Sequence, residues 1–235
     1  MPESEESLNI IYQHRFDVAQ RARKLAVWKV LCDRFFSRYI TKQDVVLDVG
    51  AGFCEFINNV QAARRIAVDA NPDLARFAAP GVETMCCRAE NIASLPAECV
   101  DVAFTSNFLE HLSDKRTVEA VLVDVHRVLK PNGRLIVMGP NIRVLPGAYW
   151  DYFDHHIPLT ERSLEEVLHL HGYKTLLSLP RFLPYTIKGR LPARPWLVRM
   201  YLAFSPITFR LWGRQFFVLA QKLDSQPHGR IANCF

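Results

Sequence analysis

Hydrophobic and polar positions follow two patterns along the chain, and segments of the two patterns alternate. Short apolar runs bounded by turn residues predict strands, whereas apolar residues spaced three and four apart predict helices. Strands are predicted at 45–49, 65–69, 82–87, 101–105 and 134–138, and helices at 54–62, 72–79 and 115–129. Strands that alternate with helices indicate an α/β fold, in which a mostly parallel sheet carries helices on both faces.

Further elements flank this alternation. Apolar positions between Ser7 and Tyr39 fall near helical spacing and predict one or two helices ahead of the first strand. Thr160 offers a hydroxyl cap to a helix that continues to Leu170, where Gly172 ends it. Two more strands are predicted, at 176–179 and 215–220.

Composition places the chain among ordinary globular proteins, with 235 residues, 49% of them hydrophobic and 23% charged. The acidic N-terminus lacks the order of a signal peptide, and no apolar run reaches the roughly 18 residues that span a bilayer. The six cysteines include no Cys-x-x-Cys spacing, which favours free thiols, a cytoplasmic location and no structural zinc.

Charge is distributed unevenly along the chain. Between Val167 and Leu223 there are nine Lys or Arg and no Asp or Glu, and aromatic residues are interleaved with the basic ones in Pro180–Gly213. Such a segment suits the interface of an anionic membrane, which predicts that the protein associates peripherally, and in a salt-sensitive way, with the inner face of the membrane. It equally suits an aromatic helix pair that completes the core and exposes its arginines to water. It would also suit a phosphate-bearing lipid acceptor, with the insertion as a lid over the acceptor pocket.

The first strand ends in a glycine turn, Val45-Val46-Leu47-Asp48-Val49-Gly50-Ala51-Gly52, where glycines let a ligand approach the backbone. The dinucleotide fingerprint places a third glycine at position 55, but this chain has Glu55 there. A carboxylate at that point would repel a pyrophosphate, so a ligand without phosphates, such as S-adenosylmethionine, fits better. Asp69 ends the second strand 19 residues after Gly50, at the distance expected of a ribose-binding carboxylate.

Together with the later run Arg127-Val128-Leu129-Lys130-Pro131-Asn132-Gly133, this order of motifs resembles the class I S-adenosylmethionine-dependent methyltransferases. The resemblance implies a Rossmann-like, seven-stranded, mostly parallel sheet whose seventh strand is antiparallel. It also implies an N-terminal helical cover over residues 1–39, a methyltransferase domain over 40–223 with a basic and aromatic insertion at 180–213 between strands six and seven, and a tail at 224–235.

The resemblance assigns cofactor contacts residue by residue. It gives Asp48, Gly50 and Gly52 to the methionine end, Asp69 to the ribose, Ala70, Ala89 and Glu90 to the adenine, and Asn107 to the region of the methyl group. The family usually has an acid followed by Ala here; Ala89 matches, but Arg88 stands at the position of the acid, so Glu90 is the candidate substitute, and an exposed Glu at a helix start is an equal reading of it. Cys54 stands where many members have another glycine.

Three histidines are candidate catalytic bases, because imidazole titrates near neutrality and can take a hydroxyl proton. His111 follows the fourth strand, and His155 and His156 lie in an aromatic loop after the fifth. The alternative is a packed aromatic corner. No metal site is predicted, since neighbouring imidazoles point apart and the zinc spacing is missing.

The runs "SNFLEHL", "GPNIR", "YWDYFDHH" and "RFLPYT" are similar to a bacterial branch associated with glycan and glycolipid assembly. Methylation of an oxygen on a small sugar-bearing or lipid-linked acceptor is therefore predicted. The chain lacks the Asn/Asp-Pro-Pro-aromatic and Pro-Cys signatures, which disfavours methylation of nucleic-acid bases. An RNA or protein methyltransferase and a cofactor-binding scaffold without turnover stay open as alternatives, and the oligomeric state is not indicated.

Overall fold

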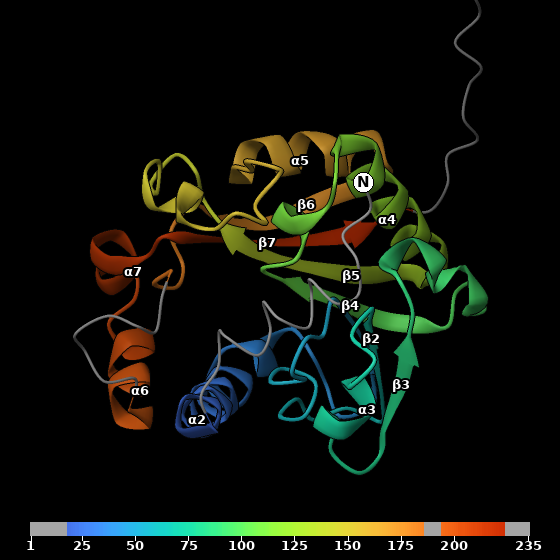
Figure 1. The fold of residues 1–235 in the computed structure, drawn as a ribbon, viewed down its shortest axis with the longest axis horizontal. Coiled ribbons are helices and arrows are strands. Elements are labelled where there is room, and N and C mark those ends of the chain that lie inside the picture. The colour runs from blue at the N-terminus through green and yellow to red at the C-terminus, as the bar shows by residue number, and fades with distance from the viewer. Residues whose placement is uncertain (1–17, 186–193, 224–235) are drawn as a thin grey trace, which may run out of the picture.

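The computed structural model describes residues 18–185 and 194–223, and it forms one sheet with helices on either side (Figure 1). The strands are β1 Val45–Val49, β2 Arg64–Asp69, β3 Val82–Cys86, β4 Val100–Ser106, β5 Leu129–Pro140, β6 Tyr173–Leu179 and β7 Gln215–Lys222. The α-helices are α2 Val18–Arg34, α3 Leu74–Phe77, α4 Lys115–Val128, α5 Glu161–Leu170, α6 Pro195–Ala203 and α7 Ile207–Trp212. Short 3₁₀ turns are η1 Phe36–Arg38, η2 Ala89–Ser94, η3 Leu109–His111 and η4 Ala148–Asp151.

The strand order is β3-β2-β1-β4-β5-β7-β6. The first five strands in chain order pair in parallel, and β7 runs antiparallel to both β5 and β6. Every strand predicted from the apolar runs is present, and the predicted antiparallel seventh strand is confirmed. Because parallel strands end at one edge, the segments after β1, β2, β4 and β5 meet along that edge, where open α/β sheets bind their ligands.

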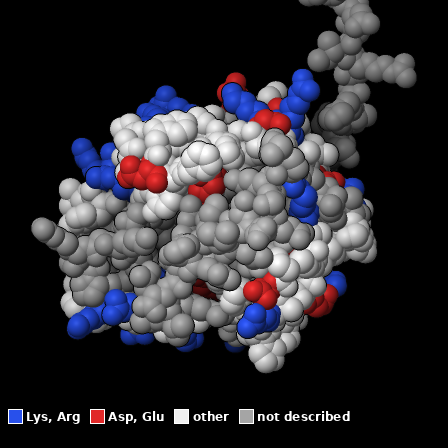
Figure 2. Space-filling view, in the orientation of Figure 1, with Lys and Arg blue, Asp and Glu red and all other residues white. Residues whose placement is uncertain are grey.

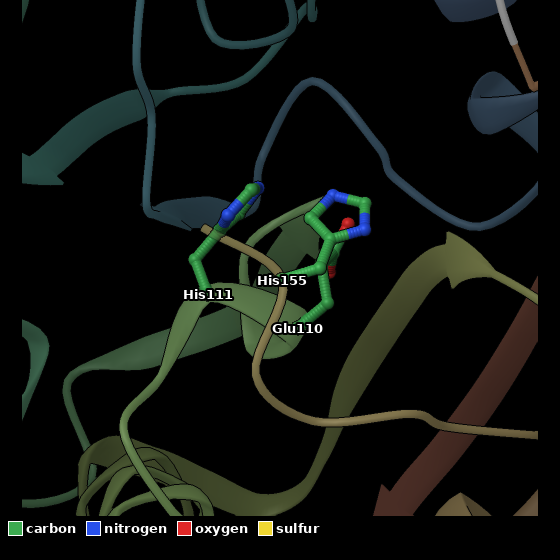
Figure 3. A group of neighbouring side chains, drawn as sticks. All are labelled: Glu110, His111 and His155. Carbon is green, nitrogen blue, oxygen red and sulfur yellow. The ribbon is translucent and has the colours of Figure 1, made fainter. Parts of the chain in front are cut away.

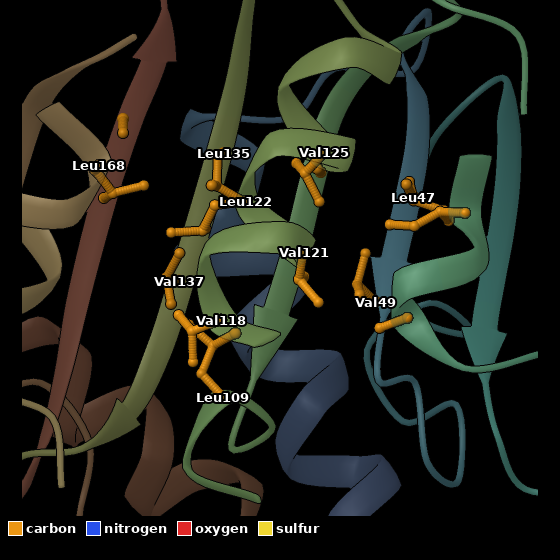
Figure 4. Packing of buried hydrophobic residues seen from close by; sticks show 14 of the residues in the cluster. Leu47, Val49, Leu109, Val118, Val121, Leu122, Val125, Leu135, Val137 and Leu168 are labelled. Carbon is orange, nitrogen blue, oxygen red and sulfur yellow. The ribbon is translucent and has the colours of Figure 1, made fainter. Parts of the chain in front are cut away.

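Two apolar layers cover the sheet. One layer joins α4 and α5 to the strands through side chains such as Val121, Val125, Leu164 and Leu168 (Figure 4). The other layer contains α2, η1, α6 and α7. Figure 1 shows α2 and α6 on the side of the sheet opposite α4 and α5, and α7 near one end of the sheet. Rings of Trp28, Phe36, Phe56 and Phe104 pack there mostly edge to face, and Phe56 and Phe104 are stacked with centroids 3.6 Å apart.

The predicted helix over 54–62 is wrong, because this segment is wound as successive turns. Two adjacent asparagines are bonded differently from residues of a regular helix: the Asn59 side chain takes a carbonyl that its own N–H would use in a helix, and the Asn58 side chain bonds to backbone groups outside the segment. Asn58 bonds to the carbonyl of Phe77 and the N–H of Ala79, at 2.8 and 2.7 Å. Asn59 donates to the carbonyl of Glu55 at 2.8 Å. The predicted helix over 72–79 shortens to α3.

The N-terminal cover is described only from Val18 onward, and the predicted tail at 224–235 lies outside the described residues. Within the described part, α2 packs against α6, so the helix before the first strand and the insertion between β6 and β7 contact each other. The cap predicted for the helix at 160–170 is confirmed, since the Thr160 hydroxyl accepts the N–H of Ser163 at 3.0 Å.

Candidate active site

The glycine turn after β1 is held tightly against β2. The N–H groups of Gly50 and Ala51 both donate to the carbonyl of Val68, at 2.9 and 3.0 Å. Gly50 and Gly52 have φ angles of +72° and +53°, a backbone region that favours glycine. Among the described residues, no atom would lie within 4 Å of a Cβ added at Gly52, so this side of the turn has room for a ligand.

Cys54 takes up the position where many family members have a further glycine, and its φ angle is +59°. Its side chain is fully buried. Cys54 therefore adopts the left-handed backbone conformation that a glycine would adopt freely, at a cost of about 1–2 kcal/mol.

Asp69 lies at the end of β2 and reaches across to the glycine turn. One carboxylate oxygen accepts the N–H of Gly52 at 2.7 Å, and the other accepts the N–H of Asn71 at 2.9 Å. Burial raises the pKa of Asp69, and these backbone donors oppose that shift. The carboxylate is therefore positioned next to the open face of Gly52, which fits the ribose and methionine portions of S-adenosylmethionine.

Asp48 is buried behind the same turn with 3% of its surface exposed. Burial and the negative charges of Asp69 and Glu55 raise its pKa well above the usual range. Glu55 does not start a helix, but its carboxylate lies 3.9 Å from the ammonium group of Lys24 in α2. Three carboxylates thus gather at the end of β1, an arrangement that disfavours a phosphate ligand and tolerates a cationic one.

The remaining candidate cofactor residues also follow strand ends. Ala70 is exposed directly after β2, and Ala89 is buried as the first residue of η2. The side chain of Glu90 lies outside the described residues. Asn107 is exposed after β4, with a φ angle of +50° and its amide 3.0 Å from the Ser106 hydroxyl.

His111 and His155 come together at this edge, although 44 positions separate them in the chain (Figure 3). Their ring centroids are 4.9 Å apart. Glu110 joins them, and one possible ligand atom from each of the three residues lies within 4.8 Å of the others. The backbone fixes this meeting, because the carbonyl of Glu110 accepts the N–H groups of His156 and Ile157 at 2.8 and 3.1 Å.

Asp154 orients the His111 ring. The Nδ1 atom of His111 lies 3.0 Å from the Asp154 carbonyl oxygen and 3.2 Å from its carboxylate Oδ2. Burial lowers the pKa of His111, but the hydrogen bond to Asp154 and the charges of Glu110 and Asp154 outweigh it, so the pKa is raised. Burial has the opposite effect on the acid Glu110, which is 2% exposed, and raises its pKa.

His155 is surrounded by aromatic rings. Its Nδ1 lies 2.9 Å from the carbonyl oxygen of Tyr149, and its ring stacks on Tyr152 with centroids 5.1 Å apart. Tyr185, in the first part of the insertion, makes an edge contact with Tyr152 with ring centroids 5.8 Å apart. His156 is exposed and stands apart from the cluster, so the structure brings together two of the three histidines predicted from sequence.

Asp154 and Glu110 are not among the candidate residues that the sequence pattern indicates. Each stands directly before a candidate histidine, and that adjacency is the only local signal. The "GPNIR" run has a structural role instead. Asn141 donates to Glu161 and to the carbonyl of Pro180, at 2.6 and 2.9 Å, and Arg143 pairs with Glu161, so this run ties β5 to α5.

Comparison with known proteins finds similarity to methyltransferases. A family model described as a methyltransferase domain matches residues 47–137, from β1 through most of β5. A Schizosaccharomyces pombe protein described as methyltransferase-like is 26% identical over 155 residues, which is 63% of this chain and 52% of the relative. The chain therefore spans about half the length of the curated relative that it matches.

Solved structures share the fold. An S-adenosylmethionine-dependent methyltransferase from Archaeoglobus fulgidus superposes with a TM-score of 0.59 at 21% identity, covering 83% of this chain and 92% of that one. A Burkholderia thailandensis 1,6-didemethyltoxoflavin-N1-methyltransferase, solved with its substrate and S-adenosylhomocysteine, has a TM-score of 0.58 at 17% identity and covers 94% and 87%. These likenesses establish a methyltransferase fold.

Proposed function

We propose that this chain, a member of the class I S-adenosylmethionine-dependent methyltransferase family, methylates an oxygen atom of a small sugar-bearing or lipid-linked acceptor, with His111 as the catalytic base. The observation that carries the proposal is the contact between His111 and Asp154 at the edge of the sheet. It gives this histidine a fixed orientation and a carboxylate partner.

The chemistry follows from that contact. When bound, S-adenosylmethionine supplies a methyl group attached to a positively charged sulfur. Transfer would form a carbon–oxygen bond as the carbon–sulfur bond breaks and neutral S-adenosylhomocysteine leaves, and the acceptor hydroxyl would lose its proton in this step. With Nδ1 of His111 donating to Asp154, the lone pair lies on Nε2, which takes that proton. The Asp154 carboxylate then stabilises the imidazolium that results.

The cofactor would lie along the glycine turn. Gly50, Gly52 and Asp48 would hold its methionine end, Asp69 its ribose, Ala70, Ala89 and Glu90 its adenine, and Asn107 would lie beside the methyl group. The open side of Gly52 and the adjacent Asp69 carboxylate support this assignment.

The acceptor assignment draws on the rings beside the base. Tyr149, Tyr152 and Tyr185 gather around His155, and aromatic walls with a few polar groups are typical of small-molecule sites. His155 is proposed as a positioning residue because it contacts the His111 ring. The Burkholderia neighbour is named for a small-molecule substrate, which favours the same broad class of acceptor.

The test is to incubate the protein with radiolabelled S-adenosylmethionine and a fractionated cell lysate. Label is expected in the lipid or sugar fraction. His111→Ala should lower the labelling rate by about 10²–10⁴, whereas His156→Ala, an exposed neighbour of the cluster, should leave it nearly unchanged. Label in RNA or protein would contradict the acceptor class, and cofactor binding without label in any fraction would favour a scaffold.

A further inference from the structure

We propose that the outer face of α6 and α7 docks on an anionic lipid bilayer. The proposal goes beyond the methyl transfer above and does not depend on which acceptor is used. In the described part of the chain no helix combines the length and hydropathy needed to cross a membrane. The contact would therefore be made by a surface of short helices.

Large apolar side chains are concentrated on this face. Twelve large apolar side chains are exposed among the described residues, and six of the twelve lie in the nineteen positions from Arg194 to Trp212. They are Trp196 at 55%, Met200 at 49%, Phe204 at 56%, Ile207 at 65%, Leu211 at 55% and Trp212 at 52% exposed. So many exposed large apolar side chains within two short helices and the turn between them indicate an interaction site.

The inner face of the same two helices already completes the core with a different set of residues. Leu202 and Phe209 are buried, and the Phe209 ring packs against Phe182 at 5.2 Å between centroids. Phe182 in turn contacts Phe35 at 4.4 Å. The Thr208 hydroxyl donates to the carbonyl of Tyr201 at 2.6 Å, which joins α7 to α6. The six exposed apolar side chains are therefore not the ones that pack α6 and α7 into the core.

Charge on this face favours an anionic partner. Arg194, Arg199 and Arg210 are exposed among the apolar side chains, and no acid occurs between Val167 and Leu223. The neighbouring helix α2 contains five basic residues and one acid, Asp33, whose carboxylate is 3.3 Å from Lys29. Figure 2 shows Lys and Arg side chains along the lower left edge, where Figure 1 places α2 and α6.

The combination of rings, aliphatic side chains and arginines selects lipid over a second protein. Tryptophan settles at the depth of the lipid headgroups, and arginine binds the phosphates around it. The position also has a use. Gln215, which follows the insertion, pairs with Pro140 at the end of β5, so the two helices emerge at the edge of the sheet that carries the candidate active site.

The experiment is co-sedimentation of the full-length protein with vesicles of phosphatidylcholine alone or mixed with phosphatidylglycerol. We expect binding to the anionic vesicles at low salt and weaker binding at high salt. Tryptophan emission should shift to shorter wavelength when anionic vesicles are added, because Trp196 and Trp212 leave water.

Matched variants identify the surface. Arg199→Gln with Arg210→Gln should weaken binding by about 30-fold, from about 1 kcal/mol for each arginine. Arg116→Gln removes an exposed arginine from α4 and should leave binding unchanged. Trp196→Ala with Trp212→Ala should weaken binding about tenfold or more and abolish the emission shift. Leu170→Ser, at an exposed apolar residue of α5, is the control for that pair.

Three results would overturn the proposal. The first is that the wild-type protein stays in the supernatant with anionic vesicles at low salt. The second is that the Arg116 and Leu170 control variants lose as much binding as the variants of the α6–α7 surface. The third is a dimer in sedimentation velocity that the Trp196 and Trp212 substitutions dissociate, because the face would then bind a second copy of this chain.

Discussion

Gly50 and Phe108 are in direct contact: a Cβ added at Gly50 would lie 2.4 Å from two atoms of the Phe108 ring. Phe108 follows β4 and Gly50 follows β1, so this contact joins the glycine turn to the loop that carries Glu110 and His111. The absence of a side chain at position 50 is what allows the candidate catalytic loop to pack on the candidate cofactor turn.

Gly50→Ala is expected to destabilise the protein, because the new methyl group overlaps Phe108 and a left-handed φ is imposed on alanine. The two effects together should cost about 2–4 kcal/mol in the free energy of unfolding. Gly52→Ala shares the φ penalty but has open space around its Cβ, so it should cost about 1–2 kcal/mol. Urea denaturation measures both, and equal losses would contradict the role given to Phe108.

The same pair separates stability from ligand binding. Gly52→Ala should weaken binding of S-adenosylmethionine by about tenfold or more, because its methyl group projects into the space assigned to the cofactor. Calorimetry on the folded variant checks this. Unchanged affinity would remove Gly52 from the cofactor site.

Asp69→Ala is expected to lower cofactor affinity by roughly tenfold to a hundredfold, since charge-assisted hydrogen bonds to the ribose contribute about 1.5–3 kcal/mol. Asp73→Ala is the matched control, because Asp73 is a half-exposed acid in the same loop and pairs only with Arg76 at 3.1 Å among the ion pairs described. If both variants bind as the wild type does, Asp69 does not contact the cofactor.

The sheet could be predicted from sequence because its signals are local. Apolar runs such as Val45–Val49 mark strands that are buried on both faces, and each run carries its own evidence. The segment over 54–62 has helical spacing too, but Asn58 bonds to Phe77 and Ala79, twenty positions further on. Tertiary partners of this kind are invisible in the local pattern, which is why the predicted helix there is wrong.

The candidate site also contains residues with a local sequence signal and residues that only tertiary contacts bring together. Gly50, Gly52 and Asp69 lie within one βαβ-like stretch, so motif spacing indicates them. The contact between His111 and Asp154 spans 43 positions and depends on backbone bonds from Glu110 to the loop after β5. Sequence could name the histidines by residue type, but it could not choose His155 over His156, because only the fold decides which of two neighbours turns inward.

Removal of metal ions tests the chemistry of Glu110, His111 and His155. These residues have the atoms to hold a divalent cation, but a cation bound to Nε2 of His111 would occupy the lone pair that the proposed base uses. Protein treated with a chelator is therefore expected to keep its full rate of methyl transfer. Loss of activity that zinc restores would assign the three residues to a metal site.

The pH dependence of turnover should report the His111–Asp154 contact. His111 accepts a proton only when neutral, so turnover should rise with pH as the solution passes the pKa of His111, which Asp154 and Glu110 raise above its ordinary value. Asp154→Asn removes the carboxylate that raises this pKa and leaves the burial that lowers it. The midpoint of the profile should then move to lower pH, and the plateau should fall about tenfold or more because the charged partner of the imidazolium is lost.

Asp151→Asn is the control for this shift, since Asp151 is an exposed acid three positions earlier in the same loop. It should leave both midpoint and plateau in place. A profile whose midpoint is the same in the wild type and in Asp154→Asn would mean that a group other than His111 takes the proton. His155, whose ring lies beside His111, would be the next residue to substitute.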